Sequence, residues 1–207
     1  RELSYGFVEV LSQNYVDGGK SGTYIKGLST YSSYYPLFKF DYTKEGVQNI
    51  IEGIWKKAYF TIANANNIIV NIESLTPDKF RDGQEEKNLI KGEALAVRAM
   101  MHFDMLRLFA PAPIVDDKKP HIPYLEDFPY YGGQPNETVD GVLQKAVRDL
   151  IEAKELIASY DTLDADHRSN LSSYRRFQLS TGSSNAVAFY GYRGYRMNYM
   201  AVTGMLA

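Results

Sequence analysis

The sequence predicts an all-α fold whose helices are joined by long loops. Two observations lead to this prediction. Apolar residues recur at helical spacing in three long segments, around residues 44–72, 89–110 and 138–160. Six of the eight prolines fall within residues 111–137, where they interrupt any regular helix and mark a long extended connection.

Residues 89–110 are the most informative segment, because their pattern places apolar residues on two sides of one helix. One row consists of Leu89, Gly92, Ala96, Ala99, Phe103, Leu106 and Ala110. A second row consists of Ile90, Ala94, Val97, Met101, Met105 and Leu108. A helix with two apolar rows is expected to pack between neighbouring elements rather than to lie on a surface. Pro111 and Pro113 prevent this helix from continuing.

The other elements follow from the same criteria. We expect further helices at residues 3–15, from about 44 to 72, at 138–160, and from near Gly194 to the end of the chain, which is expected to stop within a helix. The segments between them are rich in glycine, proline or polar residues and are expected to be loops: 16–43, 111–137 and 161–193.

The composition excludes several classes of protein. The formal net charge is −2 and no long run of one sign occurs, so neither a nucleic acid nor an anionic membrane surface is expected as a partner. The chain has no cysteine, which excludes disulfides and thiolate metal sites within it. The most apolar window, residues 94–109, contains Arg98, Asp104 and Arg107 and is not expected to span a bilayer.

Short motifs offer little catalytic chemistry. Residues 17–21 end in the Gly-Lys-Ser of a phosphate-binding loop, but Asn14 stands where that loop requires glycine, so we interpret them as a turn. His102 and Asp104 are two positions apart on a helix and face different sides, which argues against a shared metal ion or an acid–base pair. We therefore expect a protein that is not an enzyme and that uses no cofactor and no metal.

The tyrosines are the more informative side chains. Fully burying a large apolar side chain stabilises a fold by roughly 1.5–3 kcal/mol, so rings clustered in a glycine-rich loop call for an explanation. The loop at 16–43 carries Tyr24, Tyr31, Tyr34, Tyr35 and Tyr42, and a second cluster consists of Tyr190, Tyr192 and Tyr195. Such rings either fold back onto the helices or form a platform on which the apolar face of a sugar ring stacks. Trp55 shares a helical stripe with Tyr59 and Ile62 and is expected in the core.

Four segments carry recognisable patterns in a fixed order. They are WKKAYFTIANANNII at 55–69, GEALAVRAMMHFDMLRLFAPAP at 92–113, TVDGVLQKAVRDLIEAKEL at 138–156 and RMNYMAVTGMLA at 196–207. The second resembles the pattern GEA-x-x-x-RA-x-x-x-F-D-x-x-R-x-F-x-x-x-P of the SusD/RagB family of outer-membrane nutrient-binding lipoproteins. The other three resemble that family's helices at corresponding places. Together the matches cover most of residues 44–160 and, again, residues 196–207.

The resemblance implies a SusD-like fold, an array of tetratricopeptide-like helix pairs, although the sequence itself shows no repeat of about 34 residues. It implies that residues 1–207 are a single N-terminal helical domain of a longer protein. The signal peptide and the lipidated cysteine are then expected upstream of Arg1.

The resemblance also implies a function. Such a protein binds an oligosaccharide or another nutrient at the cell surface, is held to the outer membrane by a lipid, and passes its ligand to a TonB-dependent, SusC-like transporter. The implied ligand contacts lie in and beside the tyrosine-rich loop: Tyr31, Tyr34, Tyr35, Tyr24 and Asn14. Glu93, Arg98 and Arg107 belong to the family pattern and are expected to form ion pairs that hold helices in register. The alternative is a helical scaffold that docks on the transporter without binding sugar itself.

Overall fold

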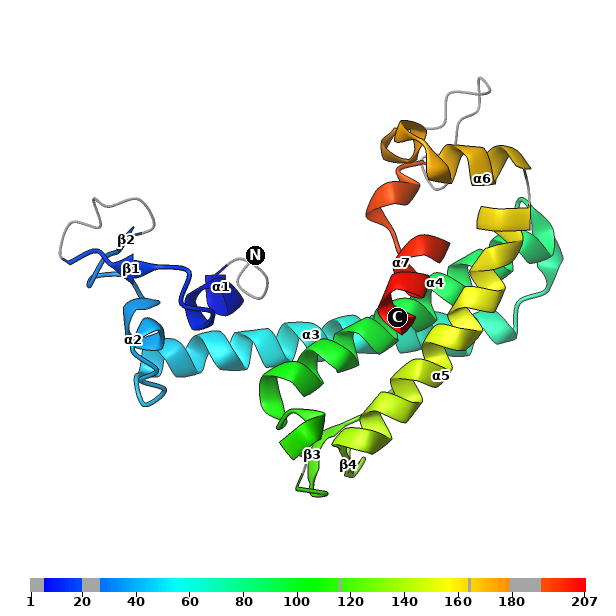
Figure 1. Cartoon of the computed structure of the whole chain (residues 1–207). Helices are drawn as coiled ribbons and strands as arrows, with labels where there is room; N and C mark the ends of the chain where they lie inside the picture. Colours follow the sequence, from blue (N-terminus) through cyan, green and yellow to red (C-terminus); the bar gives the residue numbers. More distant parts are fainter. Residues whose placement is uncertain (1–5, 20–26, 116, 164, 179–190) are drawn as a thin grey trace. The chain divides into compact units, whose positions relative to one another are not determined.

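The computed structural model describes residues 6–19, 27–115, 117–163, 165–178 and 191–207. It confirms the predicted all-α fold, because helices form the long regular elements and the strands of the described residues form two short pairs (Figure 1). The chain divides into two compact units, unit 1 (Arg1–Tyr59) and unit 2 (Phe60–Ala207). The boundary falls inside the long helix α3 (Glu45–Glu73), which therefore contributes to both units.

Unit 1 consists of short elements followed by the first part of α3. In chain order they are α1 (Val8–Leu11), β1 (Val16–Asp17), β2 (Gly27–Leu28) and α2 (Tyr35–Phe38). The two strands pair in parallel, with Val16 opposite Gly27, and α1 packs against α2. The buried side chains of Val10 and Leu37 belong to these two helices.

The helix expected at 3–15 is wrong in its extent, because within the described residues it ends at Leu11. Gln13 follows with a φ of 58°, the left-handed conformation that commonly terminates a helix. The loop expected at 16–43 also contains the short helix α2, which has a proline at its start.

Helix α3 confirms the prediction of a long amphipathic helix from about 44 to 72. Its buried side chains recur at intervals of three, four or seven residues, as one face of a helix requires: Val47, Ile54, Ala58, Ile62, Ala65 and Ile72. Trp55 is half-buried and its ring packs on that of Tyr59, with centroids 4.7 Å apart.

Unit 2 is organised around two antiparallel helices, α4 (Gly83–Phe109) and α5 (Val139–Ala158), which lie side by side in Figure 1. They are in close contact at Gly92. A Cβ atom placed on Gly92 would lie 2.7 Å from Cγ1 of Ile157 and 3.1 Å from the carbonyl oxygen of Ala153. Only glycine fits at this position without moving α5.

The first apolar row predicted for α4 is largely buried, whereas four members of the second row are only half-buried: Ile90, Val97, Met101 and Leu108. The buried apolar residues and glycine of this helix are Leu89, Gly92, Ala94, Leu95, Ala96, Ala99, Met105 and Leu106. Phe103 was predicted in the first row, yet it is 38% exposed and its ring lies 5.7 Å from the guanidinium of Arg107. Leu95 was in neither row and is fully buried. The buried side chains of this helix therefore do not coincide with the two predicted rows.

The proline-rich connection between α4 and α5 is ordered along unit 2. It contains a 3₁₀ turn, η3 (Pro113–Val115), and the antiparallel strands β3 (Pro120–Pro123) and β4 (Asn136–Thr138). Strand β4 leads directly into α5, where the hydroxyl of Thr138 accepts a hydrogen bond of 3.1 Å from the amide of Gly141. This cap places the start of α5 where the sequence predicted it.

The C-terminal part of unit 2 is more helical than expected. Four short elements follow α5: η4 (Ser159–Leu163), α6 (Ala165–Ser172), η5 (Tyr174–Phe177) and η7 (Arg193–Tyr195). Another short element, the 3₁₀ turn η2 (Pro77–Lys79), precedes α4. The last helix, α7 (Tyr199–Leu206), starts later than the expected position near Gly194. The side chain of Asn198 accepts a hydrogen bond of 2.9 Å from the amide of Ala201 and so caps α7, whereas Gly194 lies in η7.

No helix in the described part of the chain is both long enough and apolar enough to cross a membrane.

Replacing Gly92 by alanine tests the close approach of α4 and α5. We expect Gly92→Ala to lower the free energy of unfolding by about 1–3 kcal/mol, because the new methyl group overlaps Ile157. Gly53→Ala in α3 is the matched control, since nothing lies within 4 Å of its added Cβ; it is expected to be stabilising by up to about 1 kcal/mol. Urea unfolding of both variants measures the difference, and equal stabilities would refute the close contact.

Candidate functional site

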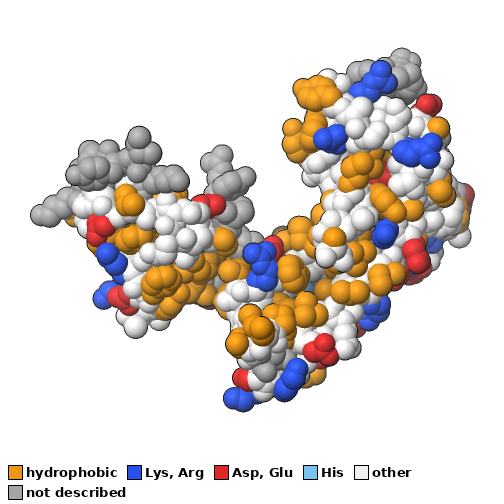
Figure 2. Space-filling view, viewed as in Figure 1, with side chains coloured by type: hydrophobic (Ala, Val, Ile, Leu, Met, Phe, Trp, Pro, Cys, Tyr) orange, Lys and Arg blue, Asp and Glu red, His pale blue; other side chains and the backbone are white. Residues whose placement is uncertain are grey.

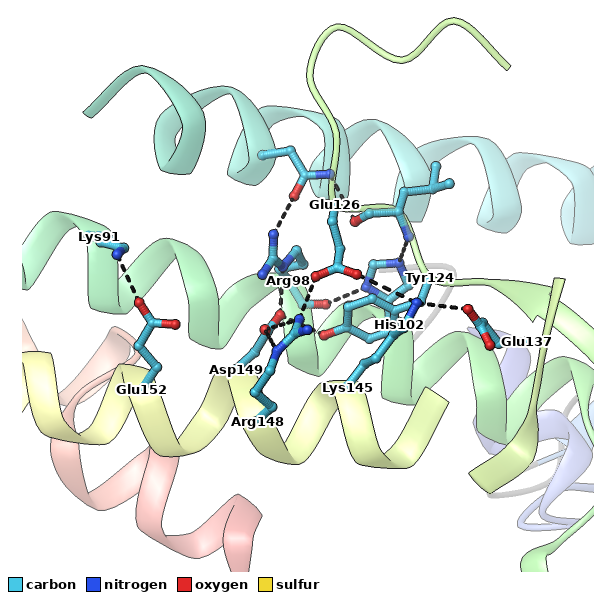
Figure 3. Close-up of polar contacts among 12 residues, drawn as sticks. Lys91, Arg98, His102, Tyr124, Glu126, Glu137, Lys145, Arg148, Asp149 and Glu152 are labelled. Carbon is cyan, nitrogen blue, oxygen red and sulfur yellow. Dashed lines mark hydrogen bonds and ion pairs between the residues drawn. The ribbon is translucent and has the colours of Figure 1, made fainter. Parts of the chain in front are cut away.

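A buried ion pair lies at the centre of unit 2 (Figure 3). Nε of Arg98 donates a hydrogen bond of 2.6 Å to Oδ2 of Asp149, which joins α4 to α5. Nη1 of Arg98 donates to Oδ1 of Asn66 at 3.2 Å, which adds the last part of α3. The three residues are 5%, 0% and 1% exposed, so a pair shielded from water links three helices.

The same network holds the connection that leads into β4. Oη of Tyr124 donates to Oδ2 of Asp149 at 2.7 Å, and Nδ2 of Asn66 donates to the carbonyl of Leu125 at 2.9 Å. Burial opposes the charged form of Asp149, but Arg98 and the further donors outweigh it and lower the pKa of this carboxyl below 3.8. Burial and the neighbouring carboxylate raise the pKa of Tyr124.

His102 completes the network as a neutral side chain. Its Nε2 accepts a hydrogen bond of 3.0 Å from the amide of Leu125, so its Nδ1 carries the proton and donates to the carbonyl of Arg98 at 2.9 Å. The imidazole stacks on Tyr124 with centroids 3.8 Å apart. Burial lowers the pKa of His102 to about 4. Both ring nitrogens are used in structural hydrogen bonds, which leaves none for a metal ion or a proton-transfer role.

Ion pairs at the rim of this network are more exposed (Figure 3). Lys145 pairs with Glu137 at 2.7 Å, and Arg148 pairs with Glu126. Farther along the same two helices, Lys91 of α4 pairs with Glu152 of α5 at 2.8 Å. Exposed pairs of this kind contribute about 0–1 kcal/mol each, so the buried pair dominates the energetics.

A second ion cluster ties the C-terminal elements of unit 2 to α4. Arg193 donates to both oxygens of Asp161, with the Nη2 bonds at 2.7 and 2.8 Å, and it also pairs with Glu93. Arg196 pairs with the second oxygen of Glu93. The carboxylate of Asp161 further accepts the amide of Tyr199 at 2.8 Å, at the start of α7. Glu93 therefore holds helices in register, as expected.

The expectation for Arg107 is wrong. Its partner is Asp104 on the same helix, at 3.4 Å, and its side chain is 61% exposed. This pair therefore cannot fix one helix against another. The ion pairs of Arg98 and Glu93 do so, because both lie on buried or half-buried sides of α4.

Among the described residues of unit 1, the most exposed aromatic ring lies in the tyrosine-rich loop. Tyr31 is 78% exposed, in the turn that precedes α2. Tyr35 is half-buried, and its hydroxyl donates to Oδ2 of Asp17 at 2.7 Å. Nζ of Lys39 donates to the same oxygen at 3.2 Å and lies 5.4 Å from the Tyr35 ring centroid. Asp17, Tyr35 and Lys39 thus form one polar cluster at the surface.

The remaining predicted ligand contacts differ in their surroundings. Tyr34 is half-buried and lies so close to Gly6 that an added Cβ there would be 2.7 Å from the tyrosine hydroxyl. Asn14 is exposed, and its amide donates to Glu9 at 2.8 Å. Tyr24 lies outside the described residues. Of the predicted set, Tyr31 therefore lies in a turn and Tyr35 in the short helix α2. Asn14 is bonded to Glu9, and Tyr34 packs against Gly6.

Asp17 and Lys39 are the residues that sequence reasoning missed. They lie 22 positions apart, and the pairing of β1 with β2 brings them to one surface: the amide of Gly18 donates to Leu28 at 2.9 Å, and that of Thr30 donates to Gly19 at 2.8 Å. The hydrogen bond from Tyr35, with those from Gly19 and Lys39, lowers the pKa of Asp17 to about 2. This carboxylate is therefore ionised at any physiological pH and is an acceptor only.

The second tyrosine cluster lies in unit 2. Tyr192 and Tyr195 are 47% and 74% exposed, and Tyr190 lies outside the described residues. No group of three His, Asp or Glu side chains within the described ranges is arranged to hold a metal ion. The arrangement offers stacking rings and hydrogen-bonding groups, which is the chemistry of a binding surface.

Comparison with known proteins agrees with this picture of a helical scaffold whose exposed rings lie outside its core. A family model, SusD-like, described as starch-binding and associating with the outer membrane, matches residues 14–173. The chain belongs to this SusD-like family. No curated protein matches the chain.

A solved structure agrees with the family. The crystal structure of a Bacteroides vulgatus ATCC 8482 protein, described as a candidate sugar-binding protein, matches with 26% identity and a TM-score of 0.52. The match covers 62% of this chain and 28% of that protein, so this chain corresponds to a minor part of its length. The structural likeness agrees with the all-α fold and with the family.

Removing one partner of the buried pair tests its role. Arg98→Ala leaves Asp149 charged and buried, so we expect a loss of about 3–5 kcal/mol in the free energy of unfolding. Arg107→Ala, which removes an exposed pair from the same helix, is expected to change it by at most about 0.5 kcal/mol. Chemical denaturation followed by circular dichroism compares the two, and similar losses would show that burial of the pair is unimportant.

The buried His102 predicts a dependence of stability on pH. The unfolded side chain titrates near 6.5 and the folded one near 4, so between these values the unfolded chain binds the additional proton. Stability is therefore complete above pH 6.5 and falls as the pH drops toward 4, by up to about 3 kcal/mol. His102→Gln is expected to be less stable at pH 7 but to have a flatter profile over this range. Parallel unfolding profiles of the two proteins between pH 7 and pH 4 would contradict the assignment.

Proposed function

We propose that this protein captures oligosaccharides at the surface of unit 1 and hands them to a TonB-dependent outer-membrane transporter, without any covalent step. The observation that carries the proposal is the exposed ring of Tyr31 in a chain that belongs to the SusD-like family. The description of that family, starch-binding and associating with the outer membrane, supports both the class of ligand and the location.

The chemistry of the surface fits a neutral sugar. The face of an aromatic ring is electron-rich, and the C–H groups on one face of a pyranose are apolar and weakly positive, so the two stack. The carboxylate of Asp17 accepts hydrogen bonds from sugar hydroxyls, and the ammonium of Lys39 donates to them. Because Asp17, Tyr35 and Lys39 already orient one another, these polar groups lose little conformational freedom when a ligand binds.

Tyr31 and the polar cluster beside it have different roles in this proposal. Tyr31 stacks on the sugar, and Tyr35 holds the carboxylate of Asp17 in place while contributing the edge of its ring. Tyr34 also remains a predicted contact of the first rank, and Tyr24 and Asn14 remain predicted contacts of the second rank. The lipid anchor, the transporter and the handover of ligand extend the same proposal to the whole protein.

A single substitution tests the stacking role. Tyr31→Ala is expected to weaken retention by a neutral polysaccharide about fivefold to tenfold, because one aromatic stack contributes about 1 kcal/mol. Tyr131→Ala is the control, since Tyr131 is 91% exposed but lies in unit 2, in the loop between β3 and β4. Affinity electrophoresis against a panel of neutral polysaccharides, amylopectin included, measures both.

The result also separates this proposal from a scaffold that binds no sugar. A scaffold would migrate identically in gels with and without each polysaccharide, yet would still co-purify with an outer-membrane transporter from detergent extracts. Retention by a glycan that Tyr31→Ala leaves unchanged would place the ligand elsewhere on the chain.

A further inference from the structure

A row of aromatic rings is exposed on unit 2, where η5 and η7 meet. Tyr174 and Tyr195, at the two ends of the row, are 73% and 74% exposed. The ring of Phe177 lies between them, with centroid distances of 6.2 Å to Tyr174 and 5.1 Å to Tyr195. We call these three side chains the aromatic ridge. They play no part in the buried network or in the Tyr31 surface.

The aromatic ridge is held by specific contacts between η5 and η7. The amide of Tyr192 donates to the carbonyl of Gln178 at 2.9 Å and so joins the two segments. Gly194 lies against the Phe177 ring, because a Cβ atom there would be 2.6 Å from Cε1 of Phe177. The hydroxyl of Ser173 caps η5 by accepting the amide of Arg175 at 3.2 Å. The rings are therefore presented by ordered backbone.

Two arginines give the aromatic ridge a positive charge. The guanidinium of Arg176 lies 4.6 Å from the Phe177 ring centroid, and its Nη1 donates to the carbonyl of Ser173 at 3.0 Å. Arg175 is exposed. Neither arginine is paired with a carboxylate in the described part of the chain, in contrast to Arg193 and Arg196, which are held by acidic partners. Figure 2 shows hydrophobic side chains next to Lys and Arg side chains over the end of unit 2 that carries α6 in Figure 1.

We propose that the aromatic ridge, with Arg175 and Arg176 beside it, is a second saccharide-binding surface that takes acidic glycans containing uronic acid. The rings stack on the apolar faces of successive sugar units, and the guanidinium groups pair with their carboxylates. Arginine suits this task because its planar fork binds a carboxylate through two hydrogen bonds. The inference rests on the proposed role in glycan capture and adds a second surface and a class of ligand.

The charge distinguishes this surface from the one on unit 1. There, Lys39 is paired with Asp17, so the cluster presents a carboxylate and an ammonium together and favours a neutral ligand. Beside the aromatic ridge, the unpaired guanidinium groups favour an anion. The two surfaces are therefore expected to select different polysaccharides.

Affinity electrophoresis with polygalacturonate tests the proposal, with amylopectin as the neutral polymer and polyglutamate as an anion without sugar rings. We expect polygalacturonate to retard the unmodified protein. The double variant Tyr174→Ala/Tyr195→Ala is expected to lose about tenfold or more in retention, and it should fold normally because both rings are exposed. Arg175→Gln/Arg176→Gln is expected to lose severalfold, and added NaCl should weaken the retention of the unmodified protein.

The controls keep this inference separate from the function proposed for unit 1. Tyr131→Ala and Tyr31→Ala should each bind polygalacturonate as the unmodified protein does, and Tyr174→Phe/Tyr195→Phe should retain binding because both rings remain. Loss of amylopectin binding in Tyr31→Ala alone concerns the unit 1 surface only. Thermal unfolding of every variant shows whether a lost interaction reflects a lost fold.

Three results would overturn the inference. The first is that polygalacturonate does not retard the protein. The second is that it retards the double tyrosine variant as much as the unmodified protein. The third is that polyglutamate retards the unmodified protein as much as polygalacturonate does, which would reduce the effect to charge alone. Unchanged binding in Arg175→Gln/Arg176→Gln would overturn the selectivity for acidic glycans. Retardation by polygalacturonate that requires both the rings and the arginines supports it.

Discussion

The buried pair of Arg98 and Asp149 is the interaction on which the rest of unit 2 depends. Two charges removed from water are tolerated only when good geometry and further hydrogen bonds compensate for the lost hydration. Here the compensation comes from Asn66 and Tyr124, which belong to different segments of the chain, and from Arg148 of α5, which donates to Oδ1 of Asp149 at 2.7 Å. The pair is satisfied only after α3, α4, α5 and the connection before β4 have all assembled. Partial assemblies leave a buried charge without its partners, so this network favours one cooperative arrangement over its competitors.

This network gives a physical meaning to the sequence patterns that mark the family. Each of the first three patterns contains one polar residue of this network, and the three residues are far apart in the sequence. These residues, Asn66, Arg98 and Asp149, meet in one hydrogen-bonded cluster. The glycine that opens the second pattern is the residue that lets α4 approach α5. These patterns therefore specify the scaffold, whereas the exposed rings proposed to contact ligand lie in loops and turns outside them.

The sequence was sufficient for the features that depend on local periodicity. The long helices α3, α4 and α5 were predicted because their apolar residues repeat at helical spacing. It was insufficient where tertiary contacts decide. Leu95 is buried although it belongs to neither predicted row, and Phe103 is exposed although it belongs to one. Arg107 belongs to the family pattern as Arg98 does, but only the structure separates an exposed side of α4 from a buried one.

The tyrosine surface was half predictable for a related reason. The density of rings in a glycine-rich loop drew attention to Tyr31 and Tyr35. Asp17 and Lys39 could not be assigned to the same cluster, because a two-residue parallel pairing of strands brings them together and so short a pairing leaves almost no periodic signal. Helix α6 was not predicted, and the start of α7 was misplaced, because helices of eight residues carry too little periodic signal.

The hydrogen bond between Tyr192 and Gln178 has a consequence for the length of the connection between η5 and η7. It fixes the distance between these two points of the chain, so η5 and η7 are held together by a backbone contact of their own. The entropy of closing a loop grows only with the logarithm of its length, about 0.6 kcal/mol for each doubling. A connection of twice the length between Gln178 and Tyr192 would therefore cost only about that much, and the backbone contact that holds η5 against η7 tolerates a change in chain length.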